Sequence, residues 1–259
     1  MIIFSHVYLM SIHLVMYSNK EPFDTTKRMM KETLHKFTKR PVIIHDYTLD
    51  SIKECEWFHH IETISEVREI RKRDGSHCAW KPYIIRDVYN VMGDNDILFY
   101  ADCSRYFTSG FKEPLDELFN SVDLYGHMAG CVADNVLNNT TCENIDVWNT
   151  ILPNEDNTLH LRKKHICASW LLMKKNTLMT AFINDWAFFV SHSNEQLRQP
   201  LITYHHTVDQ SILNILACKY NLVVFYDPEL SHHRTKYINR VLKTINCHHD
   251  KCFLRYDSL

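Results

Sequence analysis

A helix, a turn and a buried strand are predicted from residues 79–107, which read AWKPYIIRDVYNVMGDNDILFYADCSRYF. Apolar residues recur at helical spacing from Tyr83 to Val91. Pro82 suits the first turn of such a helix, where a missing N–H costs nothing. Residues 93–96, Gly-Asp-Asn-Asp, then have the chemistry of a turn.

Residues 97–101, Ile-Leu-Phe-Tyr-Ala, form a short apolar run rich in aromatic and branched side chains. Such a run is typical of a strand buried on both faces of a sheet in an α/β protein. Asp102 follows it directly. Open α/β sheets bind ligands beyond the carboxyl ends of their strands. We therefore favour contact between Asp102 and a metal or a sugar over a role in capping a turn.

The rest of the chain predicts a parallel sheet. A strand over residues 12–17 is followed by a helix from about Thr25 to Phe37, with Met29, Met30 and Leu34 inward, and by a strand over 42–45. This order is typical of α/β proteins. We expect one domain over residues 1–259, with a central, mostly parallel sheet flanked by helices.

The second half continues the pattern. We expect the chain to return to the sheet at 122–126 and again at 166–173, then to form a helix over 176–192, a helix from Thr207 and a last strand over 222–226. The polar, Asn-rich segment 134–161 is interpreted as an acceptor-side excursion or lid. The domain core is expected over about 10–236, with a basic tail at 237–259.

Composition excludes several classes of protein. The 29 Lys and Arg against 31 Asp and Glu give a net charge of −2, which offers no case for nucleic-acid binding. Nine Cys without a C-x-x-C pair favour a reducing compartment, for which we expect the cytoplasm. The apolar residues 1–17 lack a basic start and indicate a strand rather than a signal peptide. No other apolar run reaches the ~20 residues of a membrane span.

With only five Gly, the chain has no Gly-rich phosphate loop, and it has neither a Ser nucleophile elbow nor a His-Glu-x-x-His helix. What remains is an acid at a strand end, Asp102, an acid and an amide at a helix start, Asp209 and Gln210, and a late His233-Arg234 pair. These residues are suited to hold a diphosphate through a divalent cation and basic side chains while a sugar leaves it.

At these residues the sequence resembles the small GT-A-fold glycosyltransferases, nucleotide-sugar enzymes of bacterial polysaccharide clusters and large DNA viruses. The resemblance runs over about residues 12–236. It is carried by Trp-Lys-Pro-Tyr-Ile-Ile at 80–85, Gly-Asp-x-Asp-Ile-Leu-x-Tyr-x-Asp at 93–102, the Ala-Ser-x-Leu-x-x-Lys-Lys-Asn segment around Trp170, Val-Asp-Gln-Ser-Ile-Leu-Asn at 208–214 and the late His-Arg. It implies a GT-A, Rossmann-like fold.

The resemblance also implies how the donor is held. Asp102 matches the first acid of the family's D-x-D motif, which contacts the donor ribose or the metal, and Ser104 stands where many relatives have the second acid. The cation, Mn²⁺ or Mg²⁺, is then held by Asp102 and His233, for which His232 is a rival ligand. Alternatively, the enzyme works without metal through Arg234 and Lys236.

Further roles follow from the same resemblance. Lys81 and Arg86 face the nucleotide phosphates or sugar hydroxyls, although a solvated Lys81 is an equal alternative. Asp209 and Gln210 match the pair beside the anomeric carbon in retaining relatives, where Gln210 lines the reactive face of the sugar. In an inverting enzyme Asp209 is instead the base. Asp209 also suits the cap of its helix.

The expected activity is therefore transfer of a sugar from a nucleotide-diphosphate donor, such as a UDP- or GDP-sugar, to a hydroxyl of a glycan or protein glycan, with retention. The missing carboxylate at Ser104 motivates an alternative from another class, a catalytically lapsed carbohydrate-binding module. A sugar-phosphate nucleotidyltransferase is a further alternative, but it is expected to have an N-terminal Gly-rich loop, and none is present.

Overall fold

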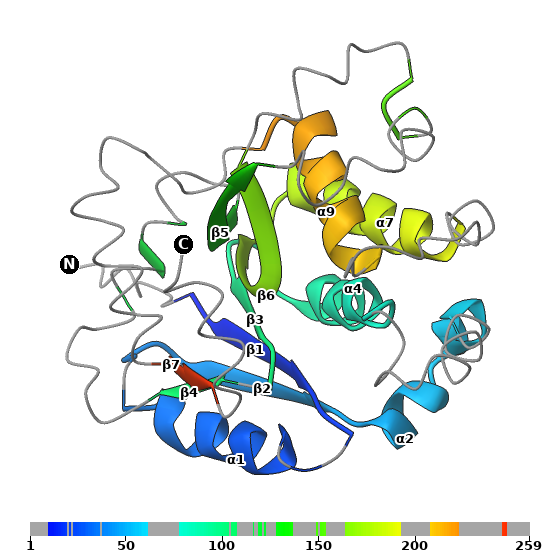
Figure 1. Ribbon diagram of the computed structural model, residues 1–259. Helices are drawn as coiled ribbons and strands as arrows, with labels where there is room; N and C mark the ends of the chain where they lie inside the picture. The colour runs from blue at the N-terminus through cyan, green and yellow to red at the C-terminus, as the bar shows by residue number, and fades with distance from the viewer. Residues whose placement is uncertain are drawn as a thin grey trace, which may run out of the picture.

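The computed structural model describes residues 10–19, 21, 23–36, 38–61, 78–103, 105–107, 116, 119–120, 122, 128–136, 149, 151–153, 164–192, 208–222 and 245–247. These residues form an α/β fold, a central sheet with helices on both faces (Figure 1). The α/β class predicted from the sequence is confirmed.

The sheet has five strands in the order β2-β1-β3-β6-β5. They span Ile12–Tyr17 (β1), Val42–Tyr47 (β2), Ile97–Ala101 (β3), Met128–Val136 (β5) and Lys164–Lys174 (β6). β1 runs parallel to β2 and β3, whereas β6 runs antiparallel to both β3 and β5. Four strands therefore point one way and β6 alone is reversed, so the sheet is mostly parallel, as predicted.

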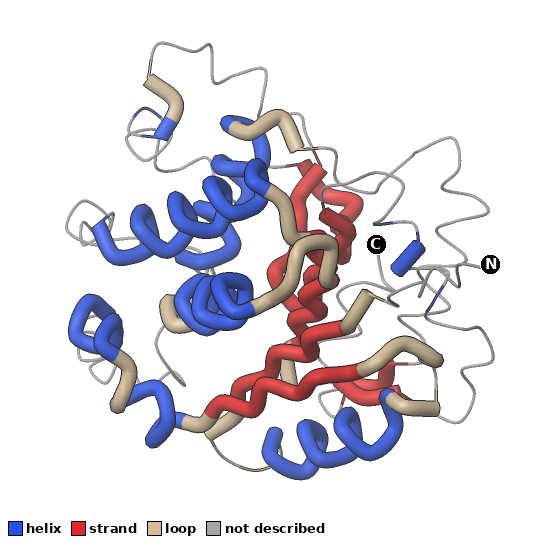
Figure 2. The backbone as a smooth tube through the Cα atoms, turned by 180° about the vertical axis from the view of Figure 1, so that it is seen from behind, coloured by secondary structure: helices blue, strands red, loops and turns tan. Residues whose placement is uncertain are grey.

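Each face of the sheet has its own hydrophobic core, because successive side chains of a strand point to opposite faces. On one face Leu14 and Met16 pack with Met30 and Leu34 of α1 (Phe23–Leu34). On the other face Val15 belongs to a larger core with α4 (Lys81–Val91), α7 (Thr177–His192) and α9 (Val208–Lys219). Seen from behind, these three helices lie together and α1 lies apart (Figure 2).

The stretch 79–101 folds as its pattern predicts, with α4 and β3 joined by the turn at residues 92–96. The predicted first strand is confirmed as β1, and the helices predicted over 176–192 and from Thr207 are α7 and α9. The first helix begins earlier than expected and ends at Leu34, and β2 continues to Tyr47.

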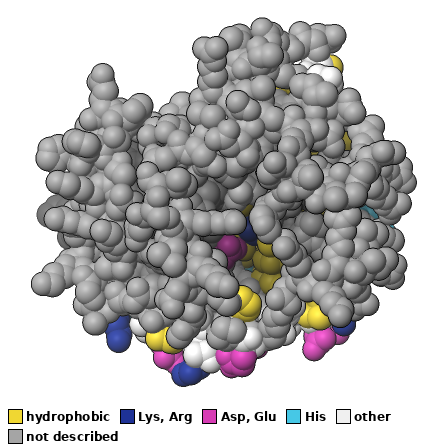
Figure 3. All heavy atoms as spheres, viewed as in Figure 1, with side chains coloured by type: hydrophobic (Ala, Val, Ile, Leu, Met, Phe, Trp, Pro, Cys, Tyr) yellow, Lys and Arg dark blue, Asp and Glu magenta, His cyan; other side chains and the backbone are white. Residues whose placement is uncertain are grey.

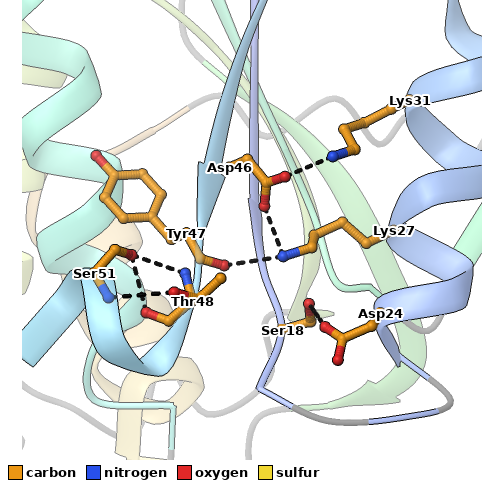
Figure 4. A network of polar contacts seen from close by, with 8 residues as sticks. All are labelled: Ser18, Asp24, Lys27, Lys31, Asp46, Tyr47, Thr48 and Ser51. Atoms are coloured by element: carbon orange, nitrogen blue, oxygen red, sulfur yellow. Dashed lines mark hydrogen bonds and ion pairs between the residues drawn. The ribbon is translucent and has the colours of Figure 1, made fainter.

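Polar contacts fasten α1 to the end of β2 (Figure 4). The two carboxylate oxygens of Asp46 each lie 2.6 Å from an ammonium, those of Lys27 and Lys31, and Lys27 also donates to the carbonyl of Tyr47. Burial alone raises the pKa of Asp46, but hydrogen bonds from the two lysines outweigh it and lower that pKa. Thr48 then begins α2 (Leu49–Lys53) with a capping box, and η1 (Glu56–Phe58) follows.

The prediction of a strand at 122–126 is wrong at Val122, which is helical, and residues 123–127 lie outside the described part. The strand that returns to the sheet is β5, which takes residues 134–136 from the predicted polar excursion. Its Ala129, Gly130 and Ala133 have low strand propensity, so pairing with β6 rather than local preference makes it a strand.

A second, two-stranded sheet pairs β4 (Arg105–Phe107) with β7 (Ile245–Cys247) from the predicted basic tail. The last predicted strand, at 222–226, lies outside the described residues except for Leu222. The single-domain assignment stays a prediction. In the described part of the chain, no helix combines the length and apolar character that crossing a bilayer requires.

Candidate active site

The candidate site lies where β3 ends and β6 continues. Ala101, the last residue of β3, pairs with Trp170, so residues 164–169 of β6 have no partner on β3. The β5–β6 register shifts at the same level, between Gly130 and Cys131, and such irregularities are common beside active sites. In the space-filling view, a basic and an acidic side chain are visible next to each other near the centre of the face (Figure 3).

Lys81, in the first turn of α4, lies at the centre of this region and is 3% exposed. Its ammonium donates to the carbonyl of Ala168 on β6 at 2.8 Å. The same nitrogen lies 3.0 Å from Asp209 Oδ2 and 3.4 Å from Asp102 Oδ1. The contact with Ala168 is a hydrogen bond, and the contacts with the two carboxylates are ion pairs. Lys81 therefore joins α4, β3, β6 and α9.

The electrostatics keep this lysine charged. Burial alone lowers the pKa of Lys81, but the carboxylates of Asp102 and then Asp209 outweigh it and hold that pKa above its ordinary value. The ammonium also lies 5.1 Å from the centroid of the Tyr100 ring, within range of a cation–π interaction.

Asp102 is the partly exposed acid of the site, with a third of its side chain accessible. Its Oδ1 accepts a hydrogen bond from the Tyr100 hydroxyl at 2.5 Å and faces Lys81. Burial, followed by the charge of Asp102, raises the pKa of Tyr100 well above its ordinary value, so the phenol stays a neutral donor. Both contacts fall on Oδ1. Within the described residues no hydrogen bond or ion pair is made by Oδ2, so this oxygen is a candidate to bind a ligand.

Asp209 and Gln210 lie in the first turn of α9. Asp209 is fully buried, and its backbone carbonyl accepts a hydrogen bond from Trp186 Nε1 at 2.8 Å. Asp209 lies in the first turn of α9 rather than at the N-cap position. The helix dipole also favours a carboxylate in this first turn. Gln210 is partly exposed, and its Oε1 accepts a hydrogen bond from the backbone N–H of Ala168 at 3.0 Å.

The structure thus brings together four of the residues predicted for the site: Lys81, Asp102, Asp209 and Gln210. Lys81 is buried, so the alternative of a solvated side chain is wrong, whereas its contact with the donor stays a prediction. Asp209 is buried, and the alternative in which it takes a proton from the acceptor stays a prediction.

Arg86 lies apart from these residues. Five positions along α4 from Lys81 correspond to a rotation of about 140° around the helix. Its guanidinium lies 4.8 Å from the ring centroid of Tyr83. Ser104, His233, Arg234 and Lys236, together with the rival ligand His232, lie outside the described residues, so their roles stay predictions.

The sequence did not single out Asn214, which the structure places at the junction of α9 and β6. It is 1% exposed and hydrogen-bonds to both backbone groups of Ile166. A signal was present, because Asn214 is polar and falls four residues after Gln210 on the inward face of an otherwise apolar helix. A buried amide in that position must find partners.

Asp102 is the one residue of the predicted metal pair that the structure describes. Among the described side chains, no three His, Cys, Asp or Glu residues come together as a set of metal ligands. One ammonium and two carboxylates nevertheless give the site a formal charge of −1 (1 − 2 = −1). A divalent cation fits this charge, with Asp102 Oδ2 as one ligand and the remaining ligands from outside the described residues or from the substrate.

No protein-family model matches the chain, and no curated protein matches it. Solved structures with a similar course include core-mannan synthase A from Aspergillus fumigatus in its Mn/GDP form, at 8% identity and a TM-score of 0.43 over 80% of this chain and 69% of that one. Another is the galactosyltransferase LgtC with donor and acceptor sugar analogues, at 16% identity and a TM-score of 0.37 over 79% and 70%. What the site can do follows from its own side chains.

Proposed function

We propose that the protein is a glycosyltransferase that moves a sugar from a nucleotide-diphosphate sugar to a hydroxyl group of a glycan, with retention of anomeric configuration. One observation carries this proposal. At the carboxyl end of β3, Asp102 presents Oδ2 beside Lys81, Asp209 and Gln210, which come from distant parts of the sequence. These are the residues at which the sequence resembles nucleotide-sugar enzymes.

Oδ2 of Asp102, which makes no hydrogen bond or ion pair with the described residues, suits two features of such a donor. A carboxylate oxygen accepts hydrogen bonds from ribose hydroxyls, and it binds the hard cation that accompanies a diphosphate. The described residues alone give this part of the site a formal charge of −1, so next to these side chains a diphosphate complexed with Mn²⁺ or Mg²⁺ is favoured over a bare one. We assign Asp102 and the predicted ligand His233 to this cation, which neutralises charge on the leaving diphosphate.

The other residues orient the sugar. Gln210 is partly exposed and is held at Oε1 by the N–H of Ala168, so its side chain has a fixed position from which to line the sugar. Asp209 does not touch the sugar in this proposal. It acts through Lys81, whose ammonium forms ion pairs with both Asp209 and Asp102. This arrangement supports retention rather than inversion, because the acid required as base in an inverting reaction is buried. Arg234 and Lys236 are proposed to meet the diphosphate as it leaves.

A thermal-shift screen tests the proposal, with UDP-, GDP- and dTDP-sugars each added with and without Mn²⁺. A donor at 100 times its dissociation constant stabilises the folded state by about 2.7 kcal/mol, which corresponds to a rise in Tm of roughly 5–10 °C for a chain of this size. Release of the nucleoside diphosphate in the presence of an acceptor then measures transfer, and the anomeric configuration of the product measures retention.

If no nucleotide sugar shifts the melting temperature, the transferase proposal is wrong. A shift with free carbohydrate but with no nucleotide identifies the alternative, a carbohydrate-binding module.

A further inference from the structure

The buried side-chain amide of Asn214 connects α9 to β6 at their junction. Its Oδ1 accepts a hydrogen bond from the backbone N–H of Ile166 at 2.8 Å. Its Nδ2 donates to the carbonyl of Ile166 at 2.9 Å and to the carbonyl of Gln210 at 2.8 Å. Three of the four hydrogen bonds open to an amide are therefore made inside the protein.

This amide replaces a missing strand. Since β3 ends opposite Trp170, the backbone groups of residues 164–169 have no partner on that strand. Asn214 binds both the N–H and the C=O of Ile166, as a neighbouring strand does. Two residues along β6, the N–H of Ala168 binds Gln210 and its C=O binds Lys81.

The spacing of the two elements matches. Gln210 and Asn214 are one helical turn apart on α9, and Ile166 and Ala168 are two residues apart on β6, so both pairs lie on one side of their element. The bond from Asn214 to the carbonyl of Gln210 links the two contacts directly. The place of the first turn of α9, relative to β6 and Asp102, thus depends on Asn214.

We propose that Asn214 is a positioning residue for the transfer reaction: it holds Gln210, and the buried Asp209 beside it, in register with the end of β3. This inference rests on the proposed function. Asn214 lies one turn below the site and acts through Gln210 rather than on the substrate. Its loss is expected to slow the chemical step more than it weakens donor binding, because Asp102 keeps its place on β3.

The chain offers a matched control in Asn176, at the opposite end of β6. Asn176 also ties a helix to this strand: its Nδ2 donates to the carbonyl of Lys174 at 3.3 Å, and its Oδ1 accepts from the N–H of Met179 in α7. Asn176→Ala therefore removes the same kind of contact from the same strand, away from the candidate site.

The experiment compares Asn214→Ala with Asn176→Ala in the full chain. Both variants are expected to lower Tm, but Asn214→Ala alone is expected to lower kcat, on the order of 10²-fold, with the KM for the donor nearly unchanged. Asn214→Asp keeps the volume and the acceptor, but it loses both donations and turns a carboxylate oxygen toward the carbonyls of Ile166 and Gln210, so it is expected to lower kcat at least as much; if one of the two variants does not fold, the other carries the comparison. Wild-type kcat in both Asn214 variants overturns the proposal, as does an equal loss of kcat in Asn176→Ala.

Amide hydrogen exchange separates this inference from the proposed function. Ala168 N–H bonds to Gln210 and not to Asn214, so its protection reports where Gln210 lies. We expect this amide to exchange faster in Asn214→Ala and Asn214→Asp than in Asn176→Ala. If the wild-type protein transfers no sugar, the proposed function fails while this measurement still decides the positioning. Unchanged protection of Ala168 overturns the inference.

Discussion

Two aspartates flank β3, and the protein uses them differently. Asp96 precedes the strand, and both its oxygens are taken by the protein itself: Oδ1 accepts from the N–H of Ser11 at 2.8 Å, and Oδ2 accepts from the N–H of Gly93 at 2.9 Å. Oδ2 also lies 3.3 Å from His13 Nε2. Asp102 follows the strand and takes its described contacts on one oxygen only.

The difference separates a structural carboxylate from a candidate ligand. Fixed by two backbone amides, Asp96 closes the turn before β3 and holds it to β1, and its side chain is 18% exposed. Asp102 is 33% exposed and lies beside a buried ion pair that fixes its orientation without using up its second oxygen. Both aspartates lie next to an end of β3, so position alone does not separate their roles. The number of carboxylate oxygens that make hydrogen bonds or ion pairs with the described residues does separate them.

The largest expected effect at the Asp102 end is on stability, in Lys81→Met. Removing the ammonium leaves the buried carboxylate of Asp209 without its partner, which costs about 3–5 kcal/mol of unfolding free energy. Urea denaturation measures the loss. Adding Asp209→Asn removes the stranded charge, so the double variant is expected to regain most of it. A Lys81→Met protein as stable as wild type would show that Lys81 does not bind these carboxylates.

The variants Asp102→Asn and Asp96→Asn test the difference between the two aspartates most directly. Asp102→Asn is expected to reduce kcat/KM on the order of 10²–10³-fold and to remove the thermal shift by donor and Mn²⁺, with little change in fold. Asp96→Asn is expected to lose about 1–3 kcal/mol of unfolding free energy and to keep both the activity and the shift.

Kinetics with the best donor and circular dichroism of the two variants check this pair. Full activity in Asp102→Asn removes Asp102 from the site, and an activity loss in a well-folded Asp96→Asn protein contradicts the division between the two ends.

The smallest effect concerns pH at the Asp96 end. His13 Nδ1 lies 3.0 Å from His45 Nε2 with the rings stacked. Among the described residues, the charged groups that act on His13 are Asp96 and Lys175. Burial lowers the pKa of His13 despite the opposing effect of Asp96, and burial followed by the charge of His13 lowers the pKa of His45.

Below the ordinary value of 6.5 the unfolded chain therefore binds more protons than the folded one, so stability falls as pH falls through this window. The slope is limited to about 1.4 kcal/mol per pH unit for each excess proton. Urea midpoints from about pH 7 to pH 5 measure it. His45→Gln, which keeps a hydrogen-bonding group but does not titrate, is expected to flatten the curve. A steeper fall in that variant contradicts the assignment.

Local sequence patterns predicted much of this fold, because the features concerned are local. The helical spacing of α4, the apolar run of β3 and the acid after it lie within residues 79–107. The environment of Lys81 could not be predicted in the same way, since its burial depends on Asp209 and Ala168, which only the folded chain brings near. β5 was missed because its alanines and glycine show no strand preference, and Asn214 because its partner is a strand that extends past the end of its neighbour.

The junction at Lys81 also bears on how the chain comes to be active during its synthesis. Lys81 emerges from the ribosome well before Asp209, and until α9 docks, burying its ammonium is opposed by the cost of removing an unmatched charge from water. In a nascent chain that has formed β1, β3 and α4 but not α9, the ammonium of Lys81 is therefore expected to stay hydrated. The proposed sugar transfer would therefore require α9 to be in place.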